Sequence, residues 1–166
     1  MVRLALGCAV VVFCTMAGRA FAGGNARRAK LLAEMMDALQ MLRVHMLDRL
    51  MPLGTALSRS QSRILNEMGT AVDKAGAAAA WSEIKSRELR RGGRLDCLSG
   101  RDIQVLDGLF EALGTTGRSE QKPVIDGVIK ELGILEAEAR SKSGEKSRLY
   151  TTLGALAGVA VVIGMI

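Results

Sequence analysis

The sequence predicts an all-α protein, a small helical bundle between an N-terminal and a C-terminal transmembrane helix. Aromatic residues make up only 3% of the 166 residues, so a core must come from Leu, Ile, Val, Met and Ala. In the middle of the chain, apolar residues recur at spacings of three and four, which is typical of amphipathic helices. Both ends of the chain are long apolar runs, whereas the middle is charged.

The two apolar ends have the length of membrane-spanning helices. Leu149–Ile166 carries no charge, and a second uncharged run, Leu4–Gly18, reaches Ala22 if Arg19 extends its guanidinium to the lipid headgroups. About 20 apolar residues cross the roughly 30 Å hydrocarbon core of a bilayer. We therefore expect a transmembrane helix over residues 1–22, a soluble helical-bundle domain over 23–148 and a second transmembrane helix over 149–166.

Basic residues flank the inner ends of both predicted spans. Arg27, Arg28 and Lys30 follow the first span, and several Lys and Arg residues over 140–148 precede the second. The positive-inside rule then places the middle domain in the cytosol and both termini outside.

An alternative topology follows from Ala20-Phe21-Ala22, which Gly23-Gly24 follows. Small residues in this arrangement fit a signal-peptide cleavage site. Under this alternative, the helical domain is exported, anchored by its C-terminal tail, and acts as an interaction module outside the cytoplasm.

The first helix of the middle domain is predicted over Ala26–Met51. Its apolar stripe is Leu32, Met35, Leu39, Leu42 and Met46. Pro52 interrupts this helix and suits the first turn of a second one. The stripe of that second helix is Leu53, Leu57, Ile64, Leu65 and Met68.

A shorter helix, Ala77–Arg90, carries the only Trp, Trp81, together with Ile84, and Gly92-Gly93 ends it. Ser99-Gly-Arg-Asp102 is a capping box with Asp in place of the usual Glu, and it opens another helix. The apolar residues of that helix are Ile103, Leu106, Leu109, Phe110 and Leu113, and Gly114 ends it.

The last helix is predicted from about Ser119. Its stripe is Ile125, Val128, Leu132, Leu135 and Ala139. We expect this helix to continue through the basic stretch Arg140–Arg148 into the second span. No segment predicts a strand.

Motifs for catalysis are missing from the sequence. It has no Gly-rich phosphate loop, no His-Glu-x-x-His and no Cys-x-x-Cys. His45 is the only histidine, and a lone imidazole without other ligands predicts no metal site. We predict that the protein is not an enzyme, has no catalytic, cofactor-binding or metal residue, and takes no small-molecule substrate.

Arg90-Arg91-Gly92-Gly93-Arg94 raises the alternative of a membrane-tethered nucleic-acid binder. No aromatic residue lies beside these arginines to stack on bases, so a solvated loop between helices is favoured. We predict no nucleic-acid partner.

Two groups of residues are candidates for contacts with other chains. Met36 and Met41 lie off the main stripe of the first helix and suit an adaptable binding surface. The candidate partner face comprises Met36, Met41, His45 and Gln121. Small residues at Gly18 and Ala22, and at Gly154 and Gly158, allow close helix packing in the membrane.

The chain resembles the stage III sporulation protein AB family over nearly its full length. The order and spacing of several short motifs carry this resemblance. They are Gly18 near the end of the first span, Ala38-Leu39-Gln40-Met41-Leu42, Pro52-Leu53-Gly-Thr-Ala56-Leu57, Ala80-Trp81, Leu109 to Leu113-Gly114, Gln121, and Leu149-Tyr150-x-x-Leu153-Gly154.

The chain departs from the family pattern in two places. Arg43-Val44-His45 stands where the family often has acidic residues, and Gly117 stands near the position of an Asp commonly found ahead of the Gln. Any partner contact made by those acidic residues is in doubt here.

The resemblance implies a protein of the mother-cell membrane in the channel complex between mother cell and forespore. It implies a soluble part similar to the cytoplasmic domains of the type II secretion F protein. The implied partners are the ATPase of that complex and its other membrane subunits, and the implied role is that of a scaffold required for spore development.

Overall fold

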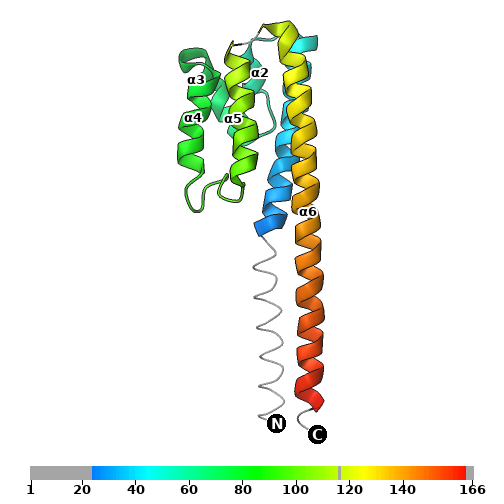
Figure 1. The fold of residues 1–166 in the computed structure, drawn as a ribbon. Coiled ribbons are helices and arrows are strands. Elements are labelled where there is room, and N and C mark those ends of the chain that lie inside the picture. Colours follow the sequence, from blue (N-terminus) through cyan, green and yellow to red (C-terminus); the bar gives the residue numbers. More distant parts are fainter. Residues whose placement is uncertain (1–23, 116, 164–166) are drawn as a thin grey trace. The chain divides into compact units, whose positions relative to one another are not determined.

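The computed structural model of the chain describes residues 24–115 and 117–163 (Figure 1). These residues are helical apart from short connections and contain no strand, which confirms the all-α prediction. Residues 30–136 form one compact unit, and residues 24–29 and 137–163 belong to a second. The first unit contains the bundle.

The first helix covers residues 24–43 and continues into a π-helical segment, η1 (Val44–Asp48). The predicted stripe is confirmed, because all five of its residues are at most 5% exposed. The prediction of an α-helix to Met51 is wrong at its end. The N–H of Arg49 donates to the carbonyl of Val44 at 3.1 Å, which is the wider π pattern, and the chain then turns through Leu50 at φ 55°.

The second predicted helix is two helices, α2 (Leu53–Ser58) and α3 (Arg63–Ala75), so the expectation of one continuous helix is wrong. Serines interrupt it. The Ser60 hydroxyl accepts a hydrogen bond from the N–H of Ser62 at 3.2 Å, and Asn66 Nδ2 donates to the carbonyl of Ser58 at 2.6 Å. Such local bonds offer the backbone an alternative to the helical ladder.

Helices α2 and α3 pack with their backbones in close approach at Gly69. A Cβ built on Gly69 would lie 2.6 Å from the backbone nitrogen of Ser58 and 2.8 Å from the carbonyl oxygen of Gly54. No side chain fits in this space. The break at residues 59–62 lets α2 fold back onto α3 at this distance.

Helices α4 (Ala77–Glu88) and α5 (Gly100–Thr115) follow the predicted boundaries closely. The capping box is confirmed: the N–H of Ser99 donates to Asp102 Oδ2 at 2.8 Å, and the N–H of Asp102 donates to Ser99 Oγ at 3.3 Å. All five predicted apolar residues of α5 are buried.

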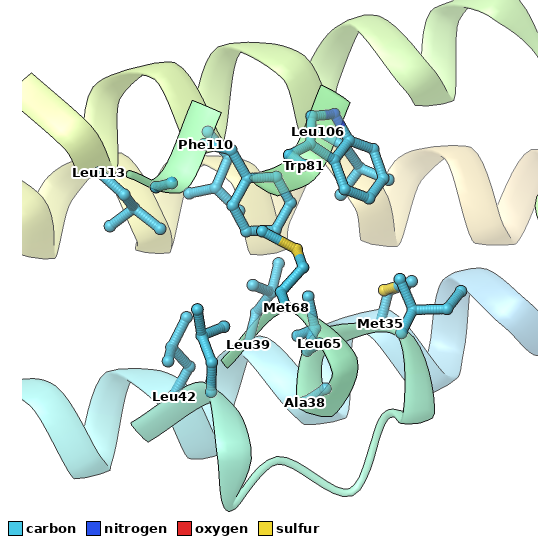
Figure 2. Packing of buried hydrophobic residues seen from close by; sticks show 14 of the residues in the cluster. Met35, Ala38, Leu39, Leu42, Leu65, Met68, Trp81, Leu106, Phe110 and Leu113 are labelled. Carbon is cyan, nitrogen blue, oxygen red and sulfur yellow. The ribbon is translucent and has the colours of Figure 1, made fainter. Parts of the chain in front are cut away.

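The core of the bundle joins the first helix, α3, α4 and α5 (Figure 2). Met68 of α3 extends toward Phe110 of α5, and the rings of Trp81 and Phe110 lie 4.8 Å apart between centroids. Both aromatic side chains are at most 2% exposed. Each large side chain buried in this way contributes about 1.5–3 kcal/mol.

The last helix, α6, runs without interruption over Arg118–Ile163, as the sequence predicts. Of its predicted stripe, Val128 is half-buried and the other four residues are fully buried. Within residues 24–115 and 117–163, no helix has a stretch that is both long and apolar enough to cross a membrane. The first predicted span, residues 1–22, lies outside the described residues, and the two-span layout stays a prediction.

Candidate interaction surface

A groove lies between α5 and α6 in the bundle. It has a volume of about 400 Å³ and is lined by Arg101, Gln104, Val105, Gly108, Leu109, Val128 and Glu131. Its floor is apolar, because Leu109 is fully buried and Val105 and Val128 are half-buried. A Cβ built on Gly108 would meet no atom within 4 Å, so the α5 side of the groove is open.

A loose ion pair lies on the rim of the groove. Arg101 Nη2 lies 3.8 Å from Glu131 Oε1, and the two side chains are 63% and 45% exposed. Pairs of this exposure contribute about 0–1 kcal/mol, so both groups remain available to other charges. Ile134, three residues beyond Glu131 on α6, is 65% exposed.

The four residues predicted as a partner face differ in exposure. Met41 is 39% exposed, whereas Met36 is half-buried, and a Cβ on Gly133 of α6 would lie 3.4 Å from its terminal methyl group. His45 and Gln121 are each only 8% exposed. Of the four, Met41 presents the most surface, and their role as a partner face stays a prediction.

His45 belongs to the π-helical segment η1. Its Nδ1 is buried and makes no hydrogen bond to the described part of the chain. Its carbonyl oxygen accepts a hydrogen bond from the N–H of Met51 at 3.0 Å. The backbone of His45 therefore helps to close the turn that leads to α2.

Arg43, the first residue of the departure from the family pattern, has a structural partner in this chain. Its Nη1 donates to Asp126 Oδ1 of α6 at 2.6 Å. This hydrogen bond and the charge of Asp126 raise the pKa of Arg43 further above its high ordinary value. Here the basic residue links the first helix to α6.

The arginines of the loop after α4 do not form one free basic surface. Arg94 Nη1 donates to Glu67 Oε1 of α3 at 3.0 Å, and its backbone N–H donates to Glu88 Oε2 at 3.1 Å. Arg90 and Arg91 are exposed. This arrangement fits the predicted structural loop.

The same contacts perturb two carboxyl groups. The side-chain hydrogen bond from Arg94 holds the pKa of Glu67 below its ordinary value. The backbone hydrogen bond from Arg94 lowers the pKa of Glu88. Arg87 also pairs with Glu67, at 2.5 Å, so the end of α4 is fixed to α3 by charge.

The residues predicted to pack in the membrane lie partly inside and partly outside the described part of the chain. Gly154 and Gly158 lie four residues apart in α6 and therefore share one side of that helix. Gly18 and Ala22 lie outside the described residues. Helix packing at these positions stays a prediction.

The described residues hold no group of three or more His, Cys, Asp or Glu side chains placed to bind a metal ion. The features they do present are an open apolar groove, an exposed isoleucine and exchangeable charges. Such features suit the binding of another protein surface.

The sequence reading missed the groove, although two signals for it exist. Gly108 lies inside a helix, where Gly costs about 1 kcal/mol relative to Ala. Ile134 is a large apolar residue off the stripe of α6. Neither signal could show that the fold places Gly108 of α5 and Ile134 of α6 on the same surface of the bundle.

Comparison with models of known protein families gave a match. The model of the stage III sporulation protein AB family matches residues 3–166. Comparison with curated proteins and with solved structures found no match.

Proposed function

The chain belongs to the stage III sporulation protein AB family, and on this premise we propose that it is a membrane scaffold of a sporulation channel or secretion-like complex. Family membership gives the chain a role at stage III of sporulation. In the proposed mechanism, the helical bundle docks a cytosolic ATPase, while the two apolar ends anchor it in the mother-cell membrane. The family match over residues 3–166 is the observation that carries the proposal.

Features of the bundle support a scaffold. A docking platform must hold its shape under load, and ion pairs connect elements that are far apart in sequence, such as Arg43 with Asp126 and Arg94 with Glu67. The uninterrupted α6 runs from the bundle into the second predicted span. A continuous helix is stiff, so it suits a part that transmits force between an ATPase and other membrane subunits.

Topology is the first property to test, and Cys97 offers the means. This thiol is partly exposed and is the only one outside the apolar N-terminal run. Intact cells are treated with a membrane-impermeant maleimide, with lysed and denatured samples as controls and a Cys97→Ser variant to identify the labelled residue. We expect labelling of Cys97 only after lysis, because the proposal places the bundle in the cytosol.

The alternative function is that of an exported, tail-anchored interaction module. The small residues Ala20-Phe21-Ala22 before Gly23-Gly24 favour it, since they fit a signal-peptide cleavage site. Labelling of Cys97 in intact cells would support this alternative and exclude docking of a cytosolic ATPase. Mass spectrometry of the mature membrane protein gives an independent answer, because an intact N-terminus excludes cleavage.

Docking itself is tested with the full-length chain in detergent and the purified ATPase of the same complex. We expect association at or below tens of micromolar, the range of functional but reversible interfaces. Deletion of the chain should block sporulation at stage III. Absence of association together with normal sporulation of the deletion strain would refute the proposal.

A further inference from the structure

Ile134 is a large apolar side chain that is 65% exposed. It lies in the regular part of α6, where the backbone does not force it outward. Single exposed apolar residues are common and need no explanation by themselves. The surroundings of Ile134 give it significance, because the α5–α6 groove lies next to it.

Ile134 and the groove lie on adjoining ridges of one surface. Glu131, which lines the groove, precedes Ile134 by three residues, so their side chains are neighbours on α6. The separation along the helix axis is about 4.5 Å. The bundle therefore presents an apolar projection and an apolar depression at nearly the same level.

We propose that this surface binds a second copy of the chain in a twofold-symmetric dimer, with Ile134 of each copy seated in the α5–α6 groove of the other. A twofold interface uses one patch on both subunits, so the patch must be complementary to itself. This patch meets that requirement in shape, because it carries both a projection and a recess. The recess, about 400 Å³, is large enough for a side chain of this size.

The charges on the patch are also complementary to those of a second copy related by the twofold axis. Arg101 and Glu131 stand on the rim at 3.8 Å, and neither is buried. In the dimer, Arg101 of one copy pairs with Glu131 of the other, and two such pairs form around the twofold axis. Exclusion of water from the groove strengthens these pairs relative to the exposed pair within one copy.

The inference does not depend on the ATPase. If the chain is anchored at both ends, as proposed above, two copies in one membrane share the same orientation. A twofold axis parallel to α6 then relates them without reversing either copy.

The test uses the full-length chain in a mild detergent and sedimentation velocity over a range of concentrations. We expect a reversible dimer, and we expect Ile134→Glu to weaken it about 100- to 10,000-fold, because the burial of one aliphatic side chain is lost at each of the two halves of the interface. Leu50→Glu is the matched control. Leu50 is 62% exposed and is not among the residues that line the groove, so this variant should dimerise as the unmodified chain does.

A cysteine pair tests the geometry directly. In a background with the native cysteines replaced by serine, one copy carries Ile134→Cys and another carries Gly108→Cys. We expect an oxidised heterodimer from this mixture and none from Leu50→Cys mixed with Gly108→Cys. A chain that is monomeric throughout, or a dimer that survives Ile134→Glu and fails to cross-link, would overturn the inference while leaving the ATPase proposal untouched.

Discussion

Gly69→Ala is expected to destabilise the bundle, although alanine is the better helix former. A Cβ atom is in ordinary van der Waals contact with its neighbours at distances of 3.4 Å and above. The Cβ that Gly69→Ala adds would lie 2.6 Å from the backbone nitrogen of Ser58 and 2.8 Å from the carbonyl oxygen of Gly54. Both atoms belong to the backbone, so α2 as a whole must move by about 0.6–0.8 Å, the shortfall from that ordinary distance. Overpacking of this kind costs about 1–3 kcal/mol.

The gain in helix propensity offsets part of this cost. Replacing Gly by Ala inside a helix stabilises it by about 1 kcal/mol. Because two backbone atoms must move, the cost lies in the upper part of its range, at about 2–3 kcal/mol. We therefore expect a net loss of about 1–2 kcal/mol, which lowers Tm by about 5–15 °C for a unit of this size. The assay is thermal unfolding followed by circular dichroism at 222 nm on the full-length chain in detergent.

Two matched substitutions isolate the cause. A Cβ on Gly127 of α6 meets no atom within 4 Å, so Gly127→Ala should raise the stability by about 0.5–1 kcal/mol. The three atoms nearest to a Cβ on Gly54 all belong to the carboxyl group of Asp73, which can rotate away, so Gly54→Ala should be close to neutral. If Gly69→Ala unfolds at or above the Tm of the unmodified chain, the close backbone approach of α2 and α3 is not real.

Three further predictions concern charge, hydrogen bonding and backbone strain. The Arg94 hydrogen bond lowers the pKa of Glu67 in the folded state. The stability that results is therefore present above the unfolded pKa of about 4.3 and is lost as the pH falls through the lowered folded pKa. When Tm is measured from about pH 6 down to about pH 3, the value for the unmodified chain should converge with that for Glu67→Gln. Asp107→Ala removes the acceptor that lies 2.6 Å from Trp81 Nε1, so it should lower the free energy of unfolding by about 1–3 kcal/mol and shift the fluorescence emission of Trp81. Asp107→Asn keeps an acceptor and should cost less. Equal losses for the two variants would contradict the role of Asp107 as the acceptor for Trp81. Leu50→Gly should raise the stability by about 0.5–1 kcal/mol, since the left-handed φ of 55° strains any residue but glycine, and a chemical denaturation curve that shows no gain would refute it.

Helix stripes and caps were predictable because they depend on residues close together in sequence. The first helix and α5 bury the residues that their spacing selects, and the Ser99 capping box forms the predicted pair of hydrogen bonds. Both rest on local periodicity and on side chains that reach three residues away.

The split between α2 and α3 was not predictable from spacing. The apolar residues on both sides of the break keep a helical spacing, so the stripe alone favours a single helix. Tertiary packing at Gly69 and the serine hydrogen bonds override that preference.

The candidate surface shows the same limit more strongly. Arg94 and Glu67 are separated by 27 positions, and Arg43 and Asp126 by 83, so no local pattern relates them. The residues that line the groove come from two helices, α5 and α6, so no single stretch of the sequence contains it. Sequence reasoning could name Gly108 and Ile134 as unusual, but only the fold places them on one surface.

The π-helical segment Val44–Asp48 has a consequence for how relatives of this chain should align. A π turn closes its hydrogen bond over one more residue than an α turn, so the segment holds one residue that a regular helix would not need. Removing one residue here would restore an α-helix while keeping Leu32 to Leu42 in their places upstream. Family members in which this helix is α-helical to its end should therefore carry a single-residue gap opposite residues 44–48. The wider turn of this chain would then hold the one inserted residue.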